Sequence, residues 1–346
     1  MNIRDLSTPA LIIDAAAFAA NVATMAALLP GTTLRPHVKA HKCTSVAAAQ
    51  ASNGHRAFTC ATPREVIGMA AAGLGDDLLL ANETIDPTRL TVLAAAQDLA
   101  SITVAIDSEA TLAAARAAGI RRVVIDVNVG LPRCGCAPQD AGRLADQARA
   151  DRIEVRGVMG YEGHLMMVVD RAEKRAKVEL AMAMLLAAHA DVGGDIVSAG
   201  GTGTYDLHSV GTGGVTEIQA GSYALMDTQY STLGLPFVQA CYVVGTVISV
   251  GPKHAVADVG LKALGMDHGN PSLDVRSSVD DVGSPADVWF CSDEHITFAK
   301  VPPASIGERV LVTPAHIDPT MAMHDTAWIV RGDEVVDRWP IDLRGW

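Results

Sequence analysis

The residues with the clearest chemical potential lie in the segment LRPHVKAHK, residues 34 to 42. Side chains on a strand alternate between its faces, so in an extended segment four basic residues share one face: Arg35, His37, Lys39 and His41. Such a cluster repels itself unless an anion neutralises it. Neighbouring cations and burial also lower the pKa of a lysine, as a nucleophilic lysine requires. The segment therefore predicts an anionic cofactor beside Lys39, with a solvated strand end as the structural alternative.

Two glycine-rich stretches could bind a phosphate group. They are SAGGTGTYDLHSVGTGG, residues 198 to 214, and QAGSYALMD, residues 219 to 227. Glycine leaves backbone N–H groups accessible to an anion, although tight turns use glycine as well. Each stretch follows a predicted strand, and loops after the seventh and eighth strands of a barrel commonly hold phosphate.

Two further loops carry polar groups at predicted strand ends. VNVGLPRCG, residues 127 to 135, contains Arg133, which could hydrogen-bond a phenolate oxygen. GYEGH, residues 160 to 164, contains Tyr161 and His164, which could orient a ligand or exchange protons. The alternative is that these are loop residues without a role.

The segment TPAHIDPTMAMHD, residues 313 to 325, contains a candidate metal site. His316 and Asp318 are two residues apart and would project to one side of an extended chain. Imidazole with carboxylate suits Mn, Mg or Zn better than a metal selected by thiolates. Histidine and aspartate also coincide on surfaces by chance. Cys134 and Cys136 lack a second pair at zinc-site spacing.

The elements that must position these residues read as a (β/α)8 barrel. Eight short β-branched runs are separated mainly by alanine-rich helical stretches. The predicted strands are Leu34–Ala40, Ala57–Ala61, Asp77–Ala81, Ile102–Ile106, Arg122–Val127, Val155–Tyr161, Asp195–Ala199 and Thr216–Ala220. The predicted helices include Thr62–Ala72, Ser108–Ala118 and Pro138–Ala150. A doubly wound open sheet is the alternative, but no G-x-G-x-x-G follows the first strand.

After residue 235 the sequence is strand-like, with Gly and Pro turns and little helix. We expect a barrel over residues 14–235 and an appended β-sandwich or barrel-like domain over 236–346. The early run Ala10–Ile13 is also strand-like and could join the C-terminal sheet.

Composition excludes some partners. The formal net charge of −12 argues against nucleic acid, which needs clustered Lys and Arg. No apolar run approaches the roughly 18 residues of a membrane span. The start does not read as a signal peptide, and six scattered cysteines suit reduced thiols. We therefore expect a cytoplasmic protein without nucleic-acid or membrane partners.

Taken together, the motifs resemble a known family. RPHVKAHK, VGLPRCG, GYEGH, GGTGTY, GSYALMD, SDEH and PAHID occur in the order found in the fold-type III pyridoxal enzymes that act on D-amino acids. This is the D-threonine aldolase and D-serine dehydratase group. The resemblance runs from residue 8 to residue 325. Ala40 departs from it, because much of the family has Thr at this position.

The resemblance implies a homodimer whose barrel binds pyridoxal 5'-phosphate and whose β domain binds a divalent metal. It makes Lys39 the Schiff-base lysine and places Arg133 and Tyr161 beside the cofactor ring. The phosphate would lie at the two glycine loops, on Gly201, Thr202, Gly221, Ser222 and Tyr223. The metal would lie on His316 and Asp318.

The resemblance also bears on the reaction. Aldolase members tend to have H-x-D with Mn or a similar cation such as Mg, whereas dehydratase members tend to have H-x-C and zinc. The His316-Ile317-Asp318 sequence therefore predicts an aldolase that cleaves D-3-hydroxy amino acids to glycine and an aldehyde, with metal-bound hydroxide or His164 as the base. The alternatives are a D-serine or 3-hydroxy-D-aspartate dehydratase, a metal-independent racemase and a non-enzymatic pyridoxal-phosphate carrier.

Overall fold

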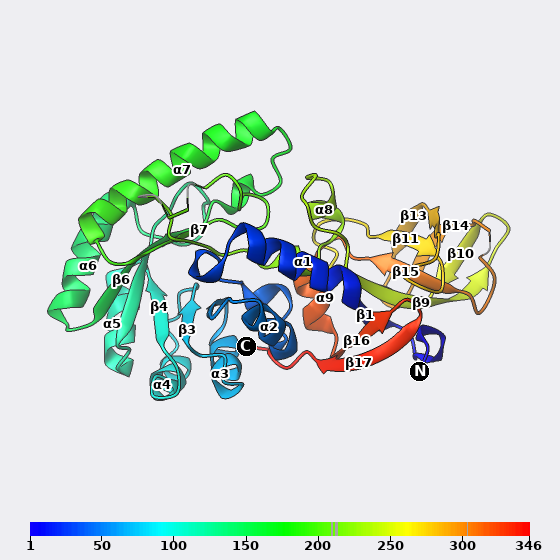
Figure 1. Ribbon diagram of the computed structural model, residues 1–346, viewed down its shortest axis with the longest axis horizontal. Coiled ribbons are helices and arrows are strands. Elements are labelled where there is room, and N and C mark those ends of the chain that lie inside the picture. The colour runs from blue at the N-terminus through cyan, green and yellow to red at the C-terminus, as the bar shows by residue number, and fades with distance from the viewer. Residues whose placement is uncertain (209, 212–213, 303) are drawn as a thin grey trace. The chain divides into compact units, whose positions relative to one another are not determined.

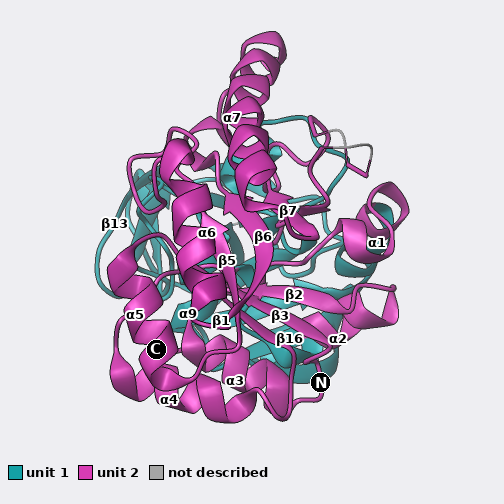
Figure 2. Ribbon diagram, turned by 90° about the vertical axis from the view of Figure 1, so that its left-hand side faces the viewer, with its two compact units in different colours: residues 1–24, 40–45, 222–342 teal, residues 25–39, 46–221, 343–346 magenta. Residues whose placement is uncertain are grey.

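The computed structural model describes residues 1–208, 210–211, 214–302 and 304–346. Three positions of the predicted glycine-rich stretch, 209, 212 and 213, lie outside this range. Two compact units are formed (Figure 2): unit 1 contains residues 1–24, 40–45 and 222–342, and unit 2 contains residues 25–39, 46–221 and 343–346. The expected domains, 14–235 and 236–346 with 1–13, stay a prediction.

Unit 2 contains a parallel sheet whose strands follow one another in chain order (Figure 1). Its strands are β2 Ala57–Cys60, β3 Asp77–Leu80, β4 Ile102–Ile106, β5 Arg122–Asp126, β6 Glu154–Gly160, β7 Ile196–Ala199 and β8 Glu217–Ile218. Residues 34–37 close the sheet. The N–H of Arg35 donates to the Ile218 carbonyl at 2.9 Å, and the N–H of Thr59 donates to the Pro36 carbonyl at 2.9 Å. The predicted TIM-like barrel is thereby confirmed.

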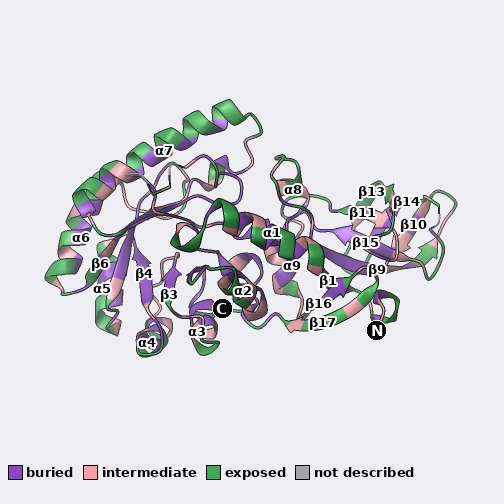
Figure 3. Ribbon diagram, in the orientation of Figure 1, coloured by how far each residue is buried: buried purple, intermediate pink, exposed green. Residues whose placement is uncertain are grey.

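Helices cover the outer face of this sheet (Figure 1). They include α3 Pro63–Ala71, α4 Pro87–Ala96, α5 Glu109–Ala118, α6 Ala141–Ala150 and α7 Arg171–Val192. The ends of α5 follow from its sequence: the Ser108 side chain caps the first turn, and Gly119 ends the helix with φ +81°. In Figure 3 the strands of this sheet are mostly buried, and the helix residues that face away from the sheet are exposed.

The first predicted strand is only partly correct. Residues 38–40 form a short 3₁₀ helix, η3 Val38–Ala40, so the alternation of side chains ends before Lys39. The shared basic face fails at Arg35 as well. This buried guanidinium donates to Glu217 Oε1 at 2.7 Å and to Asp77 Oδ2 at 2.8 Å. Burial lowers the pKa of Arg35, but the two carboxylates outweigh it and raise the pKa above its usual value. Arg35 is already neutralised and does not need an anionic ligand.

Unit 1 is built on a second, mostly antiparallel sheet. Its strands are β1 Ala10–Asp14, β9 Cys241–Val250, β10 His254–Ala257, β11 Ser272–Val275, β12 Ser284–Ala286, β13 Val288–Cys291, β14 Ile296–Ala299, β15 Arg309–Thr313, β16 Thr326–Arg331 and β17 Glu334–Pro340. β1 pairs with β9 and with β16, which confirms that residues 10–13 join the C-terminal sheet.

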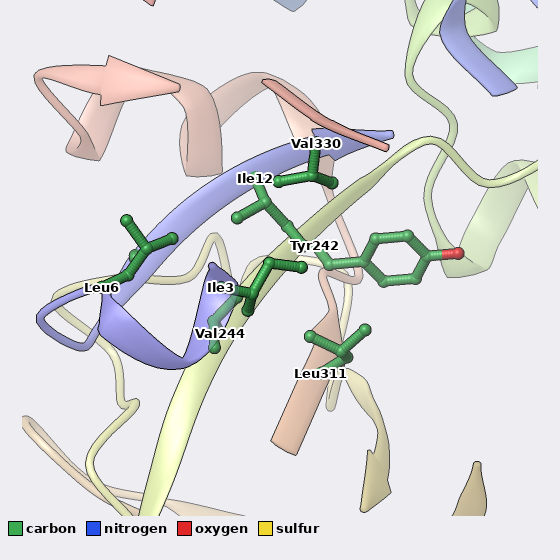
Figure 4. Close-up of a cluster of buried hydrophobic side chains, with 8 residues drawn as sticks. Ile3, Leu6, Ile12, Tyr242, Val244, Leu311 and Val330 are labelled. Carbon is green, nitrogen blue, oxygen red and sulfur yellow. The ribbon is translucent and has the colours of Figure 1, made fainter. Parts of the chain in front are cut away.

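One face of this sheet carries a compact apolar cluster. Figure 4 shows side chains from the N-terminal segment and from four strands meeting there: Ile3, Leu6, Ile12, Tyr242, Val244, Leu311 and Val330. All of them are buried, and apolar burial of this kind is the main favourable contribution to folding. The N-terminal residues are therefore part of the core of unit 1.

The remaining helices are short, apart from the N-terminal one. They are α1 Ala15–Leu28, α2 Thr44–Ser52, α8 Thr228–Ser231 and α9 Ile317–Met323, with 3₁₀ helices η1 Ile3–Asp5, η2 Gly31–Thr33, η4 Pro138–Asp140, η5 Gly163–Leu165 and η6 Ser222–Ala224. α9 contradicts the expected extended chain around Asp318. His316 is the residue before this helix and Asp318 lies in its first turn. Among the helices described, none has the length and apolarity needed to cross a membrane.

Candidate active site

Lys39 lies at the carboxyl end of the closing segment in unit 2. Its backbone N–H donates to the Nδ1 atom of His37 at 3.4 Å, and its side chain is half-buried. Because all strands of the barrel are parallel, the loops after β5, β6 and β7 lie at this same rim. The structure thus places the predicted nucleophile at the rim where barrel enzymes carry their active sites.

The loops after β5 and β6 carry three of the predicted residues. The Arg133 guanidinium lies over the Tyr161 ring, 5.4 Å from its centroid. His164 lies against Gly130: a Cβ atom there would be 3.1 Å from the imidazole Cε1. Gly130 also has φ +118°, a conformation that other residues rarely adopt. A cation and a phenol are therefore stacked at this rim, and an exposed imidazole is held against the loop after β5.

The glycine loop after β7 packs tightly on the loop after β6. A Cβ atom on Gly201 would lie 3.0 Å from Met166 Sδ, and one on Gly203 would lie 2.5 Å from the Met166 carbonyl oxygen. The buried Lys174 ammonium donates to that same carbonyl at 2.9 Å and to the Gly203 carbonyl at 3.0 Å. The backbone contact at Gly203 leaves no room for a side chain, whereas a side chain at Gly201 would require Met166 to shift. This packing fixes the loop that carries Thr202.

The second glycine loop contributes to both units. Gly221 ends a segment of unit 2, and Ser222 and Tyr223 begin the next segment of unit 1. Ser222 Oγ donates to Asp318 Oδ1 at 3.3 Å within unit 1. The Tyr223 ring is fully buried and packs against Phe237, with ring centroids 5.5 Å apart. Their predicted contact with a phosphate stays a prediction.

In unit 1 the predicted metal ligand His316 meets two residues that the sequence reading missed. Its Nδ1 atom lies 2.7 Å from Asp267 Oδ2, and its ring stacks on His268 with centroids 3.9 Å apart. Ligand atoms of these three residues lie within 4.8 Å of one another. Partial burial raises the pKa of Asp267, but His316 outweighs this and lowers it. The signal in the sequence that could have indicated this cluster is the adjacent Asp267-His268 pair in the segment MDHG, residues 266 to 269.

The N-terminus of α9 is anchored by another residue that the sequence reading missed, Asp227. Its Oδ2 atom accepts a hydrogen bond from the Ile317 N–H at 3.1 Å. Burial, with a contribution from nearby Asp318, raises the pKa of Asp227. This contact fixes the backbone between His316 and Asp318.

Comparisons with known proteins agree with this arrangement. Residues 13–229 match the alanine racemase N-terminal domain, and residues 240–330 match a putative serine dehydratase domain. A D-threonine aldolase of Arthrobacter sp is 32% identical over 98% of this chain and 93% of the relative. The chain belongs to the D-threonine aldolase and D-serine dehydratase family.

Further members of this family differ in their reactions. A 3-hydroxy-D-aspartate aldolase of Paracoccus denitrificans is 29% identical over 100% of this chain and 94% of the relative. The crystal structure of a D-threonine aldolase from Filomicrobium marinum has a TM-score of 0.89 and 34% identity, covering 99% of this chain and 96% of that chain. D-threo-3-hydroxyaspartate dehydratase from Delftia sp. HT23 has a TM-score of 0.88 and 25% identity, with complete coverage of both chains. These matches show that this chain has the alanine racemase-like fold.

Proposed function

We propose that the protein is a pyridoxal-phosphate- and divalent-metal-dependent aldolase that cleaves D-3-hydroxy amino acids to glycine and an aldehyde. The observation that carries the proposal is Asp318, a carboxylate two residues after His316. A carboxylate there favours a hard or borderline cation, whereas a thiolate would favour zinc. The identity of 32% with a D-threonine aldolase over nearly the whole chain supports the same reaction.

The residues at the rim of the barrel fit pyridoxal phosphate. Lys39 supplies a half-buried primary amine, and the glycine loop around Thr202 is fixed by close packing. Arg133, which lies over the Tyr161 ring, would supply a cation for the phenolate oxygen of the cofactor ring. When bound, the cofactor supplies an electron sink for the bond that breaks at Cα.

Unit 1 has donors suited to a divalent cation, since ligand atoms of Asp267, His268 and His316 lie within 4.8 Å of one another. His316 and Asp318 would hold it, and the Asp267 carboxylate orients His316 through Nδ1. A cation at this place would stabilise negative charge on a hydroxyl oxygen of the substrate. Mn²⁺ suits this mixed donor set, and Mg²⁺ and Zn²⁺ are the other candidates.

The remaining task is to accept the proton of the substrate 3-hydroxyl. His164 is the residue that we assign to it, because its imidazole is exposed and is held against Gly130. Imidazole is the side chain most often used as a general base near neutral pH. The homodimer and the cytoplasmic location expected from the sequence stay predictions.

A dehydratase of the same family is the second candidate function. It is favoured by the match of residues 240–330 to a serine dehydratase domain and by the TM-score of 0.88 to a dehydratase. Such an enzyme breaks the Cα–H bond and expels the 3-hydroxyl. The same residues serve either reaction, so the products decide between them.

The test is product analysis on D-threonine, D-phenylserine and D-threo-3-hydroxyaspartate, with Mn²⁺ present and after EDTA treatment. Glycine with an aldehyde is the expected outcome, and it requires metal. Dominant release of ammonia and a 2-oxo acid would replace the aldolase by the dehydratase. Racemisation that persists without metal would favour a racemase, and pyridoxal phosphate binding without turnover would favour a carrier.

A further inference from the structure

A carboxylate that the proposed reaction does not use lies buried behind the glycine loop of unit 2. Glu162, in the GYEGH motif after β6, is fully inaccessible to solvent. Its Oε1 atom accepts hydrogen bonds from the Thr204 hydroxyl at 2.7 Å and from His208 Nε2 at 3.0 Å. Its Oε2 atom accepts one from the Gly200 N–H at 3.2 Å. One side chain thus joins the start, middle and end of the segment after β7.

The geometry of the glycine loop depends on this network. Thr204 Oγ, which donates to Glu162, also accepts a hydrogen bond from the Gly201 N–H at 3.2 Å. Gly200 has φ +77°, and a Cβ atom there would lie 2.9 Å from His208 Nε2. The direction of the backbone through Gly200 and Gly201 is therefore set by Glu162, Thr204 and His208.

The charge of Glu162 needs a partner. Burial raises the pKa of this carboxyl, but the hydrogen bonds and charge of His208, with Thr204, outweigh it and lower the pKa. An ionised carboxylate only accepts hydrogen bonds, so Nε2 of His208 carries the hydrogen. The Nδ1 atom of His208 is buried and has no hydrogen-bond partner among the described residues. Among the described residues, Glu162 is therefore the only charged group within hydrogen-bonding distance of the His208 ring.

An unbalanced carboxylate at this place would oppose phosphate binding. The loop after β7 is the one expected to receive a phosphate dianion, and charges in a poorly solvated interior interact strongly. An imidazolium at His208 would cancel the charge of Glu162, and Lys174 holds the other side of the loop. The pair then shapes the loop without repelling the anion in front of it.

We propose that Glu162 and His208 form a charge-balanced pair that positions the Gly200–Thr204 loop for the phosphate group of the cofactor. Both are positioning residues, because neither is placed against the reacting atoms. The inference rests on the proposed function, since it requires that this loop binds pyridoxal phosphate.

The test compares pyridoxal phosphate with pyridoxal, which lacks the phosphate group. The full chain is stripped of cofactor, and the affinity for each compound is measured by absorbance titration for the unmodified protein and for His208→Gln, Glu162→Gln and the double variant. In His208→Gln the uncompensated carboxylate should weaken pyridoxal phosphate binding about tenfold or more, while pyridoxal binding changes less than about twofold. The double variant, again neutral, should recover most of the loss. His189→Gln, on the outer helix α7, is the matched control and should bind both compounds like the unmodified protein.

Three results would overturn the inference. Equal losses for pyridoxal and pyridoxal phosphate would mean general damage to the barrel, which circular dichroism and melting would register independently. If the double variant bound pyridoxal phosphate as weakly as His208→Gln, charge balance would not be the cause of the loss. If His208→Gln bound pyridoxal phosphate as tightly as the unmodified protein, the pair would have no role in phosphate binding. Failure of the unmodified protein to bind pyridoxal phosphate at all would instead refute the proposed function, so the two failures are distinguishable.

Discussion

The Asp267 carboxylate and the His316 imidazole are joined by a hydrogen bond of 2.7 Å between Oδ2 and Nδ1. This contact engages one ring nitrogen of His316 and leaves Nε2 for another ligand. A histidine that binds a metal commonly donates its other N–H to a carboxylate, which fixes the tautomer and increases the basicity of the ligating nitrogen. We therefore expect Nε2 of His316, and not Nδ1, to bind a cation.

Asp267→Asn should weaken Mn²⁺ binding by about 10- to 100-fold, the usual cost of losing such an outer partner. Asparagine can still accept the hydrogen bond, but it lacks the charge that makes the imidazole more basic. Calorimetric titration of the metal-stripped protein measures this, with bound pyridoxal phosphate unchanged. Asp287→Asn, an exposed aspartate in the same unit, is the control. If His268→Ala weakened binding as much as Asp267→Asn, the cation would instead lie within the Asp267, His268 and His316 cluster.

Lys39 should be the residue that carries the cofactor. The unmodified protein should be yellow and should be bleached by borohydride, and peptide mapping should then find the pyridoxyl group on Lys39. Lys39→Ala should lose both the reducible colour and turnover, since the covalent link is absent. Lys42→Arg, three residues away, should retain the colour. A pyridoxyl group on Lys42 would contradict the assignment of the nucleophile.

Asp318 should set the metal preference. Asp318→Cys replaces a hard oxygen by a soft thiolate, so Mn²⁺-supported cleavage of D-threonine should fall and affinity for Zn²⁺ should rise, each by roughly tenfold or more. Metal titrations followed by aldehyde release measure both effects. Conversion to a dehydratase is not expected from this change alone, because Cα deprotonation also needs a placed base. An unchanged ratio of Mn²⁺ to Zn²⁺ affinity would remove Asp318 from the metal site.

The fold could be predicted because its signals are local. β-branched runs and helix ends such as Ser108 and Gly119 mark elements along the chain, and the parallel strands then place the loops at one rim. The partners of the site residues could not be predicted in this way. Glu162 and His208 are 46 positions apart and Asp267 and His316 are 49 apart, so their pairing depends on tertiary structure. The expected need for an anionic ligand also failed at Arg35, because its acidic partners Asp77 and Glu217 are distant in sequence.

Arg35 should contribute strongly to the stability of the barrel. Arg35→Met removes the cation between Glu217 and Asp77 and leaves two carboxylates without it, one of them buried. Breaking a buried ion pair from one side costs about 3–5 kcal/mol of the free energy of unfolding. Urea denaturation measures the loss. The exposed pair of Arg56 with Asp76 provides the control, since Arg56→Met should change stability little. Comparable effects of the two changes would contradict a buried network at this end of the barrel.

Asp126 should destabilise the folded protein near neutral pH. Burial, followed by the nearby Glu83 carboxyl, raises the pKa of Asp126 well above its usual value. A raised folded-state pKa means that the folded protein favours the protonated acid. Stability is then lost as the pH rises from the unfolded-state pKa through the folded-state pKa.

Asp126→Asn should remove this penalty, because asparagine stays neutral and can still donate a hydrogen bond to Glu83. The melting temperature at pH 8 should rise by roughly a few degrees, and the gain should shrink as the pH falls towards 4, where the aspartic acid is itself protonated. Asp98→Asn, at an exposed position of the same unit, should show no such pH-dependent gain. Thermal melts of the cofactor-free protein at a series of pH values measure the difference. A variant that is less stable than the unmodified protein at pH 8 would show that the ionised carboxylate of Asp126 is stabilised by Arg133 more than it is penalised by burial.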